Sequence, residues 1–380
     1  MGKRNKVTTR DIADYTGLSQ STVSMVLSGR AGVSFTEDTE RTVKEAAKKL
    51  GYKKPVKKSK SLEGSLADTI LVLAPLLTNS YYTSIIHAIN EQAAVHNYRV
   101  MTQVTFRNAD QESACLTLAR TSRLAGIIIL YPISRIADAN AIFKTTPVVL
   151  IGEKPDQVRF DCVELDSRKP AYLMADHLLA LGHRRFAFIS TPIKKHEISR
   201  VRRLEGLRLA CADHGLREDC VEVWQPSPQA YRRYAYQSAE YRTGYEMTQK
   251  VLKEGSRVTA LIGQNDMTAY GILAALREGG FRIPRDYSVG GFDDATFSSM
   301  PQISLTTVDH ATLQKGKDAV DLIAARKQAL SPGTGRQDTE REAGDPGGLA
   351  GPKRSTRIEY EPRLVVRNST GPAAVHMAEI

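Results

Sequence analysis

One short segment near the N-terminus combines side chains and a helical spacing that could serve to recognise a base sequence. Within residues 20–28 the apolar side chains of Val23, Val26 and Leu27 share one face of a helix. The opposite face carries Gln20, Ser21, Ser24, Met25 and Ser28. A face of Gln and Ser without charge is unusual for a solvated helix, but amides and hydroxyls can hydrogen bond to base edges in the major groove of DNA. An ordinary small helical hairpin is the alternative.

The rest of the sequence lacks the residue spacings of a catalytic or metal site. It contains no G-x-S-x-G, no P-loop and no metal-ligand spacing, and its 8 His residues are scattered. Asp293 and Asp294 could form a carboxylate pair, but adjacent residues at the end of a strand point apart. The 4 Cys residues lie far apart without a C-x-x-C, so neither a zinc site nor a redox dithiol is indicated. We therefore predict no catalytic residues, no metal and no cofactor.

The elements that position the polar face are three short predicted helices. Residues 1–50 show helical spacing and no strand pattern. Thr9 and Ser19 are expected to cap the first two helices. The three helices are predicted to end near Thr16, Ser28 and Leu50, with the third beginning near Thr39. Because the following residues are rich in Lys and Ser, we place a helix-turn-helix headpiece at 1–50 and a linker at 51–64.

The positive charge of the chain is concentrated in its first sixty residues. Residues 1–60 contain 14 Lys or Arg and 6 Asp or Glu, whereas the other 320 residues contain 39 and 36. A basic module ahead of a nearly neutral body favours a polyanionic partner, because Lys and Arg that neutralise phosphates release condensed counterions. A solvated basic tail is the alternative.

From residue 69 onward, short apolar strands alternate with amphipathic helices. Strands are predicted at Thr69–Ala74, Arg99–Val104, Gly126–Leu130, Val148–Ile151, Arg185–Ile189, Val221–Trp224, Ala260–Ile262 and Ser288–Phe292, and helices at Ser84–His96, Pro170–Leu181, Arg200–His214 and Thr268–Gly279. This alternation predicts an α/β core with parallel sheets covered on both faces. So many units favour two doubly wound parallel-sheet subdomains, with any ligand in the cleft at the carboxyl ends of their strands.

We predict that the two core subdomains are each built from separate stretches of the chain. The N-terminal core subdomain is placed at 65–165 with 293–325, and the C-terminal core subdomain at 166–292 with 356–370. Residues 331–355 are rich in Gly, Pro and charge and poor in apolar side chains, so we expect a mobile loop there. A final strand is predicted at Leu364–Arg367.

The run from Val7 to Gly29 resembles the headpiece of the LacI/GalR family of bacterial transcription regulators. The resemblance implies that Gln20, Ser21 and Met25 contact bases and that Ser19, Thr22 and Ser24 approach phosphates, and we add Thr8 to the DNA-binding set. Met25 stands where we expect an Arg that recognises guanine, so the usual operator sequence of the family is in doubt. The loop at 33–38 is also two residues longer than the family pattern.

The linker resembles the hinge of the same family, which becomes helical on DNA. By this resemblance Leu62 would wedge into the minor groove and kink a base step. Lys57 and Lys58 of the same basic linker are expected to meet phosphate. The linker departs from the family pattern by one extra residue and by Ser59 and Lys60 in place of Ala and Arg. A flexible linker without specific DNA contact is the alternative.

The resemblance extends through most of the core, over about 1–330 and 357–371, and implies a periplasmic-binding-protein-like fold. Its clearest segments are 172–189, 264–271, 283–294, 305–308 and 364–369. Carried over to this sequence, the effector-binding residues are Tyr81, Tyr82, Arg203, Asn265 and Asp293. Aromatic faces with a few convergent polar groups suit a small ligand. A carbohydrate is expected first and a purine second. Taken singly, Asn265 could instead cap a helix, and Asp293 could satisfy a turn.

As a whole, the resemblance implies a repressor that binds a near-palindromic operator as a homodimer and responds to an effector. The sequence does not indicate whether the effector releases or promotes DNA binding. An enzyme or a solute-binding protein would use the same α/β core, but neither accounts for the headpiece. The N-terminus lacks the apolar stretch of a signal peptide, and no apolar run approaches the length of a membrane span. We therefore expect a cytoplasmic protein without membrane contact.

Overall fold

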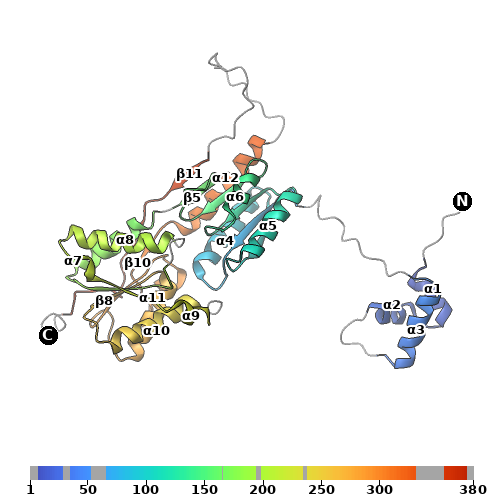
Figure 1. Ribbon diagram of the computed structural model, residues 1–380, viewed down its shortest axis with the longest axis horizontal. Helices are drawn as coiled ribbons and strands as arrows, with labels where there is room; N and C mark the ends of the chain where they lie inside the picture. Colours follow the sequence, from blue (N-terminus) through green and yellow to red (C-terminus); the bar gives the residue numbers. More distant parts are fainter. Residues whose placement is uncertain are drawn as a thin grey trace, which may run out of the picture. The chain divides into compact units, whose positions relative to one another are not determined.

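The computed structural model describes residues 7–28, 35–52, 66–164, 166–193, 198–233, 238–330 and 355–374. The chain divides into two compact units, Met1–Leu62 and Glu63–Ile380 (Figure 1). We call them the headpiece and the core unit and describe each by itself.

The headpiece contains three helices, α1 (Thr9–Thr16), α2 (Gln20–Ser28) and α3 (Glu37–Lys49). Thr8, and not the expected Thr9, caps α1. The Thr8 hydroxyl accepts a hydrogen bond from the backbone N–H of Asp11 at 3.3 Å, and the Asp11 carboxylate accepts one from the backbone N–H of Thr8 at 2.6 Å. This reciprocal pair is a capping box, which requires an acidic or amide side chain three residues after the cap. Asp11 stands at that distance from Thr8.

A small apolar cluster holds the three headpiece helices together. Gly17, with a φ of 68°, forms the turn between α1 and α2, a conformation that a side chain would oppose. The buried side chains come from all three helices: Ile12, Ala13, Val23, Val26, Val43, Ala46 and Ala47. This packing buries Val23 and Val26 of α2 and leaves Gln20, Ser21 and Ser24 exposed, as the helical spacing predicts.

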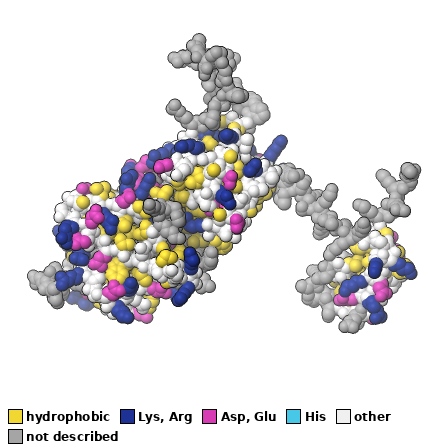
Figure 2. Space-filling model, in the orientation of Figure 1, with side chains coloured by type: hydrophobic (Ala, Val, Ile, Leu, Met, Phe, Trp, Pro, Cys, Tyr) yellow, Lys and Arg dark blue, Asp and Glu magenta, His cyan; other side chains and the backbone are white. Residues whose placement is uncertain are grey.

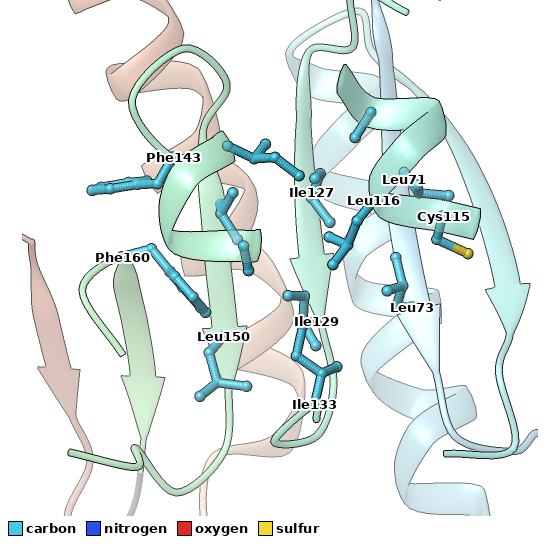
Figure 3. Close-up of a cluster of buried hydrophobic side chains, with 14 of the residues drawn as sticks. Leu71, Leu73, Cys115, Leu116, Ile127, Ile129, Ile133, Phe143, Leu150 and Phe160 are labelled. Atoms are coloured by element: carbon cyan, nitrogen blue, oxygen red, sulfur yellow. The ribbon is translucent and has the colours of Figure 1, made fainter. Parts of the chain in front are cut away.

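The first sheet of the core unit has six parallel strands in the order β11-β5-β4-β3-β1-β2. The strands are β1 (Thr69–Ala74), β2 (Arg99–Val104), β3 (Gly126–Ile129), β4 (Val148–Ile151), β5 (Asp161–Glu164) and β11 (Arg357–Glu359). The covering helices are α4 (Ser80–Val95), α5 (Ala109–Thr121), α6 (Ile136–Ile142) and α12 (Thr312–Leu330). Leu71 and Leu73 pack toward α5 and α6 (Figure 3), whereas Ile70 and Val72 pack toward α4 and α12. Alternate residues of one strand thus supply both apolar layers.

The second sheet has four parallel strands in the order β7-β6-β8-β9. The strands are β6 (Phe186–Ile189), β7 (Val221–Trp224), β8 (Ala260–Gly263) and β9 (Ser288–Gly290), and the helices are α7 (Arg168–Ala180), α8 (Ile198–Asp213), α9 (Pro228–Arg232), α10 (Ala239–Lys253) and α11 (Asp266–Glu278). Phe186 and Phe188 pack with α7 and α8, and Ala187 and Ile189 with α10 and α11. In Figure 1 these helix pairs lie on opposite faces of the sheet. The predicted fold class is confirmed.

Two assignments of residues to subdomains were wrong. β11 was expected in the C-terminal core subdomain, but it pairs with β5 in the first sheet. Residues 293–309 were expected in the N-terminal core subdomain, but β10 (Thr307–Asp309) pairs with β12 (Arg363–Val365), and Val308 packs in the second apolar core. β10 and β12 form a separate two-stranded antiparallel sheet beside the second apolar core. The chain crosses between the subdomains after β10 and again between β11 and β12, and three-residue strands carry too little pattern to reveal such crossings.

The surface of the core unit mixes charges of both signs. Figure 2 shows Lys and Arg side chains interspersed with Asp and Glu over its visible face. This agrees with the near balance of charge outside residues 1–60. Within the described parts of the chain, none of the helices combines the length and the apolar composition needed to cross a membrane.

Candidate functional site

The predicted DNA-binding face of α2 lies on the surface of the headpiece. Gln20, Ser21 and Ser24 are exposed, Thr22 and Met25 are partly buried, and Val23 between them is fully buried. The Gln20 amide donates a weak hydrogen bond to the Thr9 hydroxyl at 3.3 Å. Its position at the first turn of α2 leaves it accessible for a stronger partner. This arrangement matches that expected of a recognition helix.

Hydroxyl groups surround the N-terminus of α2. The Ser19 hydroxyl accepts from the backbone N–H of Thr22 at 3.1 Å and so caps the helix, as predicted. It also lies 2.8 Å from the Ser21 hydroxyl and 2.9 Å from the Thr22 hydroxyl. The positive end of a helix dipole beside donor hydroxyls is suited to a phosphate. Thr8 is exposed but is engaged by Asp11. Lys57, Lys58, Leu62 and most of the predicted 331–355 loop lie outside the described residues.

A cavity of about 120 Å³ in the core unit brings together all five residues predicted to bind an effector: Tyr81, Tyr82, Arg203, Asn265 and Asp293. The lining residues follow the carboxyl ends of strands in both sheets, including β1, β4, β8 and β9. Loops at this edge are where doubly wound sheets bind ligands. Asp293 was expected with Tyr81 in the N-terminal core subdomain, but its backbone N–H donates to the carbonyl oxygen of Val308 of β10 at 3.1 Å. Because Val308 packs in the second apolar core, Asp293 belongs to the C-terminal core subdomain.

Arg203 extends from α8 into this cavity. Its guanidinium lies over the Phe292 ring at 4.8 Å, donates to the backbone carbonyl of Gln264, and approaches the Asp293 carboxylate at 3.9 Å. Among the described residues, its Nε–H has no hydrogen-bond partner although the atom is buried. A buried donor without a partner is costly. Arg203 therefore retains a donor that a bound ligand could satisfy.

Asp293, His310 and Lys315 form a buried chain of polar groups beside Arg203. The Lys315 ammonium lies 3.0 Å from His310 Nδ1, and His310 Nε2 lies 3.1 Å from the Asp293 carboxylate. Because an ammonium only donates, Nδ1 accepts, and the ring proton sits on Nε2 and points at Asp293. The three residues are 2–6% exposed.

Burial shifts the pKa of every member of this chain toward its neutral form. It raises the pKa of Asp293 to about 7, against the opposing effect of Arg203 and Lys315. It lowers the pKa of Lys315 to about 8 and, together with the charges of Lys315 and Arg203, holds that of His310 well below its usual value. At neutral pH the imidazole is therefore uncharged, and Lys315 is mostly protonated.

Two tyrosines at the start of α4 supply the aromatic surface of the cavity. The rings of Tyr81 and Tyr82 meet edge to face at 5.2 Å, and the Tyr81 ring lies 5.4 Å from that of His310. Burial raises the pKa of the Tyr81 phenol, mainly because it loses contact with water. The phenol therefore stays protonated and can donate a hydrogen bond.

Several contacts cross between the two subdomains at the cavity. Asn79 caps α4 and Asn265 caps α11, and the side-chain amides of both donate to Glu240, at 3.2 and 3.3 Å. The helix-capping hypothesis for Asn265 is therefore correct, and the same side chain also lines the cavity. Glu153, after β4, accepts from the backbone N–H of Ser167 at 2.7 Å and pairs with Arg202 of α8. Glu240 thus binds groups from both sides of the cavity, and Glu153 of the first subdomain binds two groups of the second.

Sequence reasoning missed several lining residues: Asn79, Glu153, Arg200, Glu240, His310 and Lys315. In the sequence alone, each of them is an ordinary polar residue of a helix or loop. The apolar neighbours of Lys315 in α12, with Ala319 and Ile323 at helical spacing, mark it as a charge on a buried face, which was the available signal. Asp293 and Asp294 form no pair, because Asp294 turns away and binds Arg367 at 2.6 Å.

Comparisons with known proteins agree with both parts of this structure. Residues 8–54 match the family described as bacterial regulatory proteins, lacI family, and residues 175–346 match a periplasmic binding protein-like domain. The chain is 25% identical over 364 residues to the HTH-type transcriptional repressor PurR of Mannheimia succiniciproducens, covering 95% of this chain and 98% of the relative.

Two solved structures are similar in fold. One is a complex of the transcriptional regulator CelR with cellobiose, with a TM-score of 0.62, 22% identity, and coverage of 96% of this chain and 100% of that chain. The other is the lac repressor dimer bound to operator and the anti-inducer ONPF, with a TM-score of 0.62, 24% identity, and coverage of 97% and 100%. Both similarities extend over nearly the whole chain.

Proposed function

The chain belongs to the lacI family of bacterial regulatory proteins and is a DNA-binding transcription repressor, and from this premise we propose how its two units divide the work. The headpiece of a homodimer binds the half-sites of a near-palindromic operator through the exposed face of α2. The core unit binds a small effector that changes operator affinity. In this proposal Gln20, Ser21 and Met25 contact bases, and Leu62 inserts into the minor groove. The residues that contact phosphates are Thr8, Ser19, Thr22, Ser24, Lys57 and Lys58.

The observation that supports the effector site is the convergence of Tyr81, Tyr82, Arg203, Asn265 and Asp293 on one cavity. These residues come from four separate places in the sequence and from both subdomains. Carboxylate, amide and guanidinium groups beside aromatic rings can bind the hydroxyls of a carbohydrate, which we propose as the effector class. The similar CelR structure holds cellobiose.

A purine is the second candidate. Relatives of this chain are named PurR, and the Tyr81 and Tyr82 rings offer faces on which a base could stack. The two candidates present different hydrogen-bonding groups to the cavity, since a purine has ring nitrogens where a carbohydrate has many hydroxyls. Titration of the purified protein with hypoxanthine and with hexoses separates them.

The switch follows from contacts on both sides of the cavity. A ligand held by Tyr81 of the first subdomain and by Arg203 of the second favours one closure of the core unit. Only a ligand with different affinity for the two closures can move the equilibrium between operator-binding states. The core unit therefore acts as the sensor, whether the effector weakens or strengthens operator binding.

The test of this proposal is the Arg203→Ala variant. Because a hydrogen bond from a charged group contributes about 1.5–3 kcal/mol, ligand affinity is expected to fall at least tenfold, while operator affinity without ligand stays close to wild type. The measurement is operator binding by fluorescence anisotropy during effector titration. Arg217→Ala, at a position 86% exposed, is the matched control and should respond like wild type. If Arg203→Ala responded to the effector as wild type does, the cavity would not be the site through which the effector changes operator affinity.

A further inference from the structure

We propose that the effector carries an anionic group, a carboxylate or a phosphate, which Lys315 and Arg203 bind inside the cavity. The inference rests on the proposed effector site and adds the charge of its ligand. It narrows the proposed effector class from carbohydrates in general to sugar acids and sugar phosphates.

The charge balance at the centre of the cavity favours an anionic ligand. Lys315 and Arg203 are both cationic, and both act on the Asp293 carboxylate. Glu153 and Asp309 act more weakly on Lys315. Since burial raises the pKa of Asp293 to about 7, this carboxylate carries less than a full negative charge at neutral pH. His310, which joins Lys315 to Asp293, is uncharged. Buried charges are stable when they are paired, so the pair of cations favours an additional anion.

The surrounding charges do not remove this excess. Four basic side chains and three carboxylates line the cavity: Arg107, Arg200, Arg203 and Lys315, and Glu153, Glu240 and Asp293. Glu153 is already neutralised by Arg202, which lies outside this lining. Burial raises the pKa of Glu240, although two side-chain amides donate to it and the charge of Arg200 opposes the shift. A concave site with an excess of one sign concentrates ligands of the other sign.

Lys315 and Arg203 also retain N–H donors that an anionic ligand could use. The Lys315 ammonium has three N–H groups, and the contact with His310 occupies one of them. The buried Nε–H of Arg203 has no partner among the described residues. The Arg203 guanidinium of α8 and the Lys315 ammonium of α12 both line this cavity, and together they match the several acceptor oxygens of a carboxylate or phosphate.

A purely structural role for Lys315 is the competing explanation. In that case its ammonium would serve only to hold His310 and Asp293. The two explanations differ in one readout, because a structural lysine would affect neutral and charged ligands alike, whereas an anion-binding lysine affects the charged ligand selectively.

The experiment is titration calorimetry of the full chain at pH 7 with stereochemically matched ligands. The probes are D-glucose, D-glucuronate and D-glucose 6-phosphate, and the corresponding galactose series. In the series that binds, we expect a charged member to bind wild type at least about tenfold more tightly than the neutral hexose. The uronate and phosphate arms distinguish the two anionic groups. This comparison requires no variant.

The role of Lys315 is tested with Lys315→Met, which keeps the length of the side chain and removes the charge. It should lose the tenfold preference. Lys317→Met, the same change at a position of α12 that is 41% exposed, should keep it. Thermal unfolding of both variants verifies that they are folded.

Each other outcome counts against a particular proposal. If the neutral hexose binds as tightly as its charged partners, the inference is wrong while the carbohydrate site stands. If Lys315→Met retains the preference, Lys315 does not bind the anion. If neither series binds at millimolar concentration, the carbohydrate proposal and this inference both fail.

Discussion

Gln20 and Lys57 are expected to contribute to operator binding in different ways. Gln20 lies exposed on α2, and its amide can form two hydrogen bonds with an adenine edge. Gln20→Ala should therefore cost about 1–3 kcal/mol at one base position of the operator and relax specificity there. Lys57→Ala should weaken all sequences alike and reduce the salt slope of binding by about one unit, if the lysine meets phosphate.

The measurement for these two variants is operator affinity against a panel of single-base substitutions at several salt concentrations. Ser24→Ala serves as a comparison on the same face of α2, since a hydroxyl discriminates less between bases than an amide does. If Gln20→Ala lowered the affinity for every sequence of the panel by the same factor, direct base recognition by that side chain would be contradicted.

At the scale of elements, the close contact of α10 and α11 depends on two glycines. A Cβ at Gly271 would lie 2.0 Å from the backbone oxygen of Tyr241, and one at Gly244 would lie 2.0 Å from that of Thr268. Backbone atoms cannot move aside as a flexible side chain does. Gly271→Ala is therefore expected to lower the free energy of unfolding by about 1–3 kcal/mol, as overpacking does elsewhere. Chemical denaturation measures the change.

Gly279→Ala is the matched control for this prediction. A Cβ there would first meet the Phe281 ring, at 3.1 Å, which can rotate away. Its effect on the free energy of unfolding should be smaller than that of Gly271→Ala. Equal effects would mean that loss of glycine flexibility, and not the helix contact, is being measured.

For the whole molecule, we expect the core unit to fold and sense ligand without the headpiece. The division of the chain at Leu62 and Glu63 supports this independence. A chain of residues 63–380 should retain wild-type ligand affinity and sediment as a dimer, but should not bind operator. Analytical ultracentrifugation, calorimetry and gel retardation provide the three readouts. Retardation of operator DNA by the truncated chain would contradict the proposed separation of roles, and a monomer would place the dimer contacts in the headpiece.

The sequence by itself determined the headpiece helices, most strands of the two large sheets and the two kinds of unit. Local spacing predicts α2 and its exposed face, since the positions of Val23 and Val26 depend only on the period of a helix. Continuous apolar runs likewise predict β1 and β4, because a strand buried on both faces needs apolar side chains at every position. The resemblance to a family supplied the five candidate cavity residues, which spacing alone does not connect.

The tertiary structure alone decided which segments share a sheet and which charges meet. β11 pairs with β5, and β10 pairs with β12, through contacts between residues far apart in sequence. Strands of three residues carry no period that could predict these pairings. Lys315 is an ordinary lysine of an amphipathic helix until α12 packs against the first sheet and carries it beside His310 and Arg203. Its lowered pKa and its proposed role arise from burial among those partners, a property that exists only once the chain has folded.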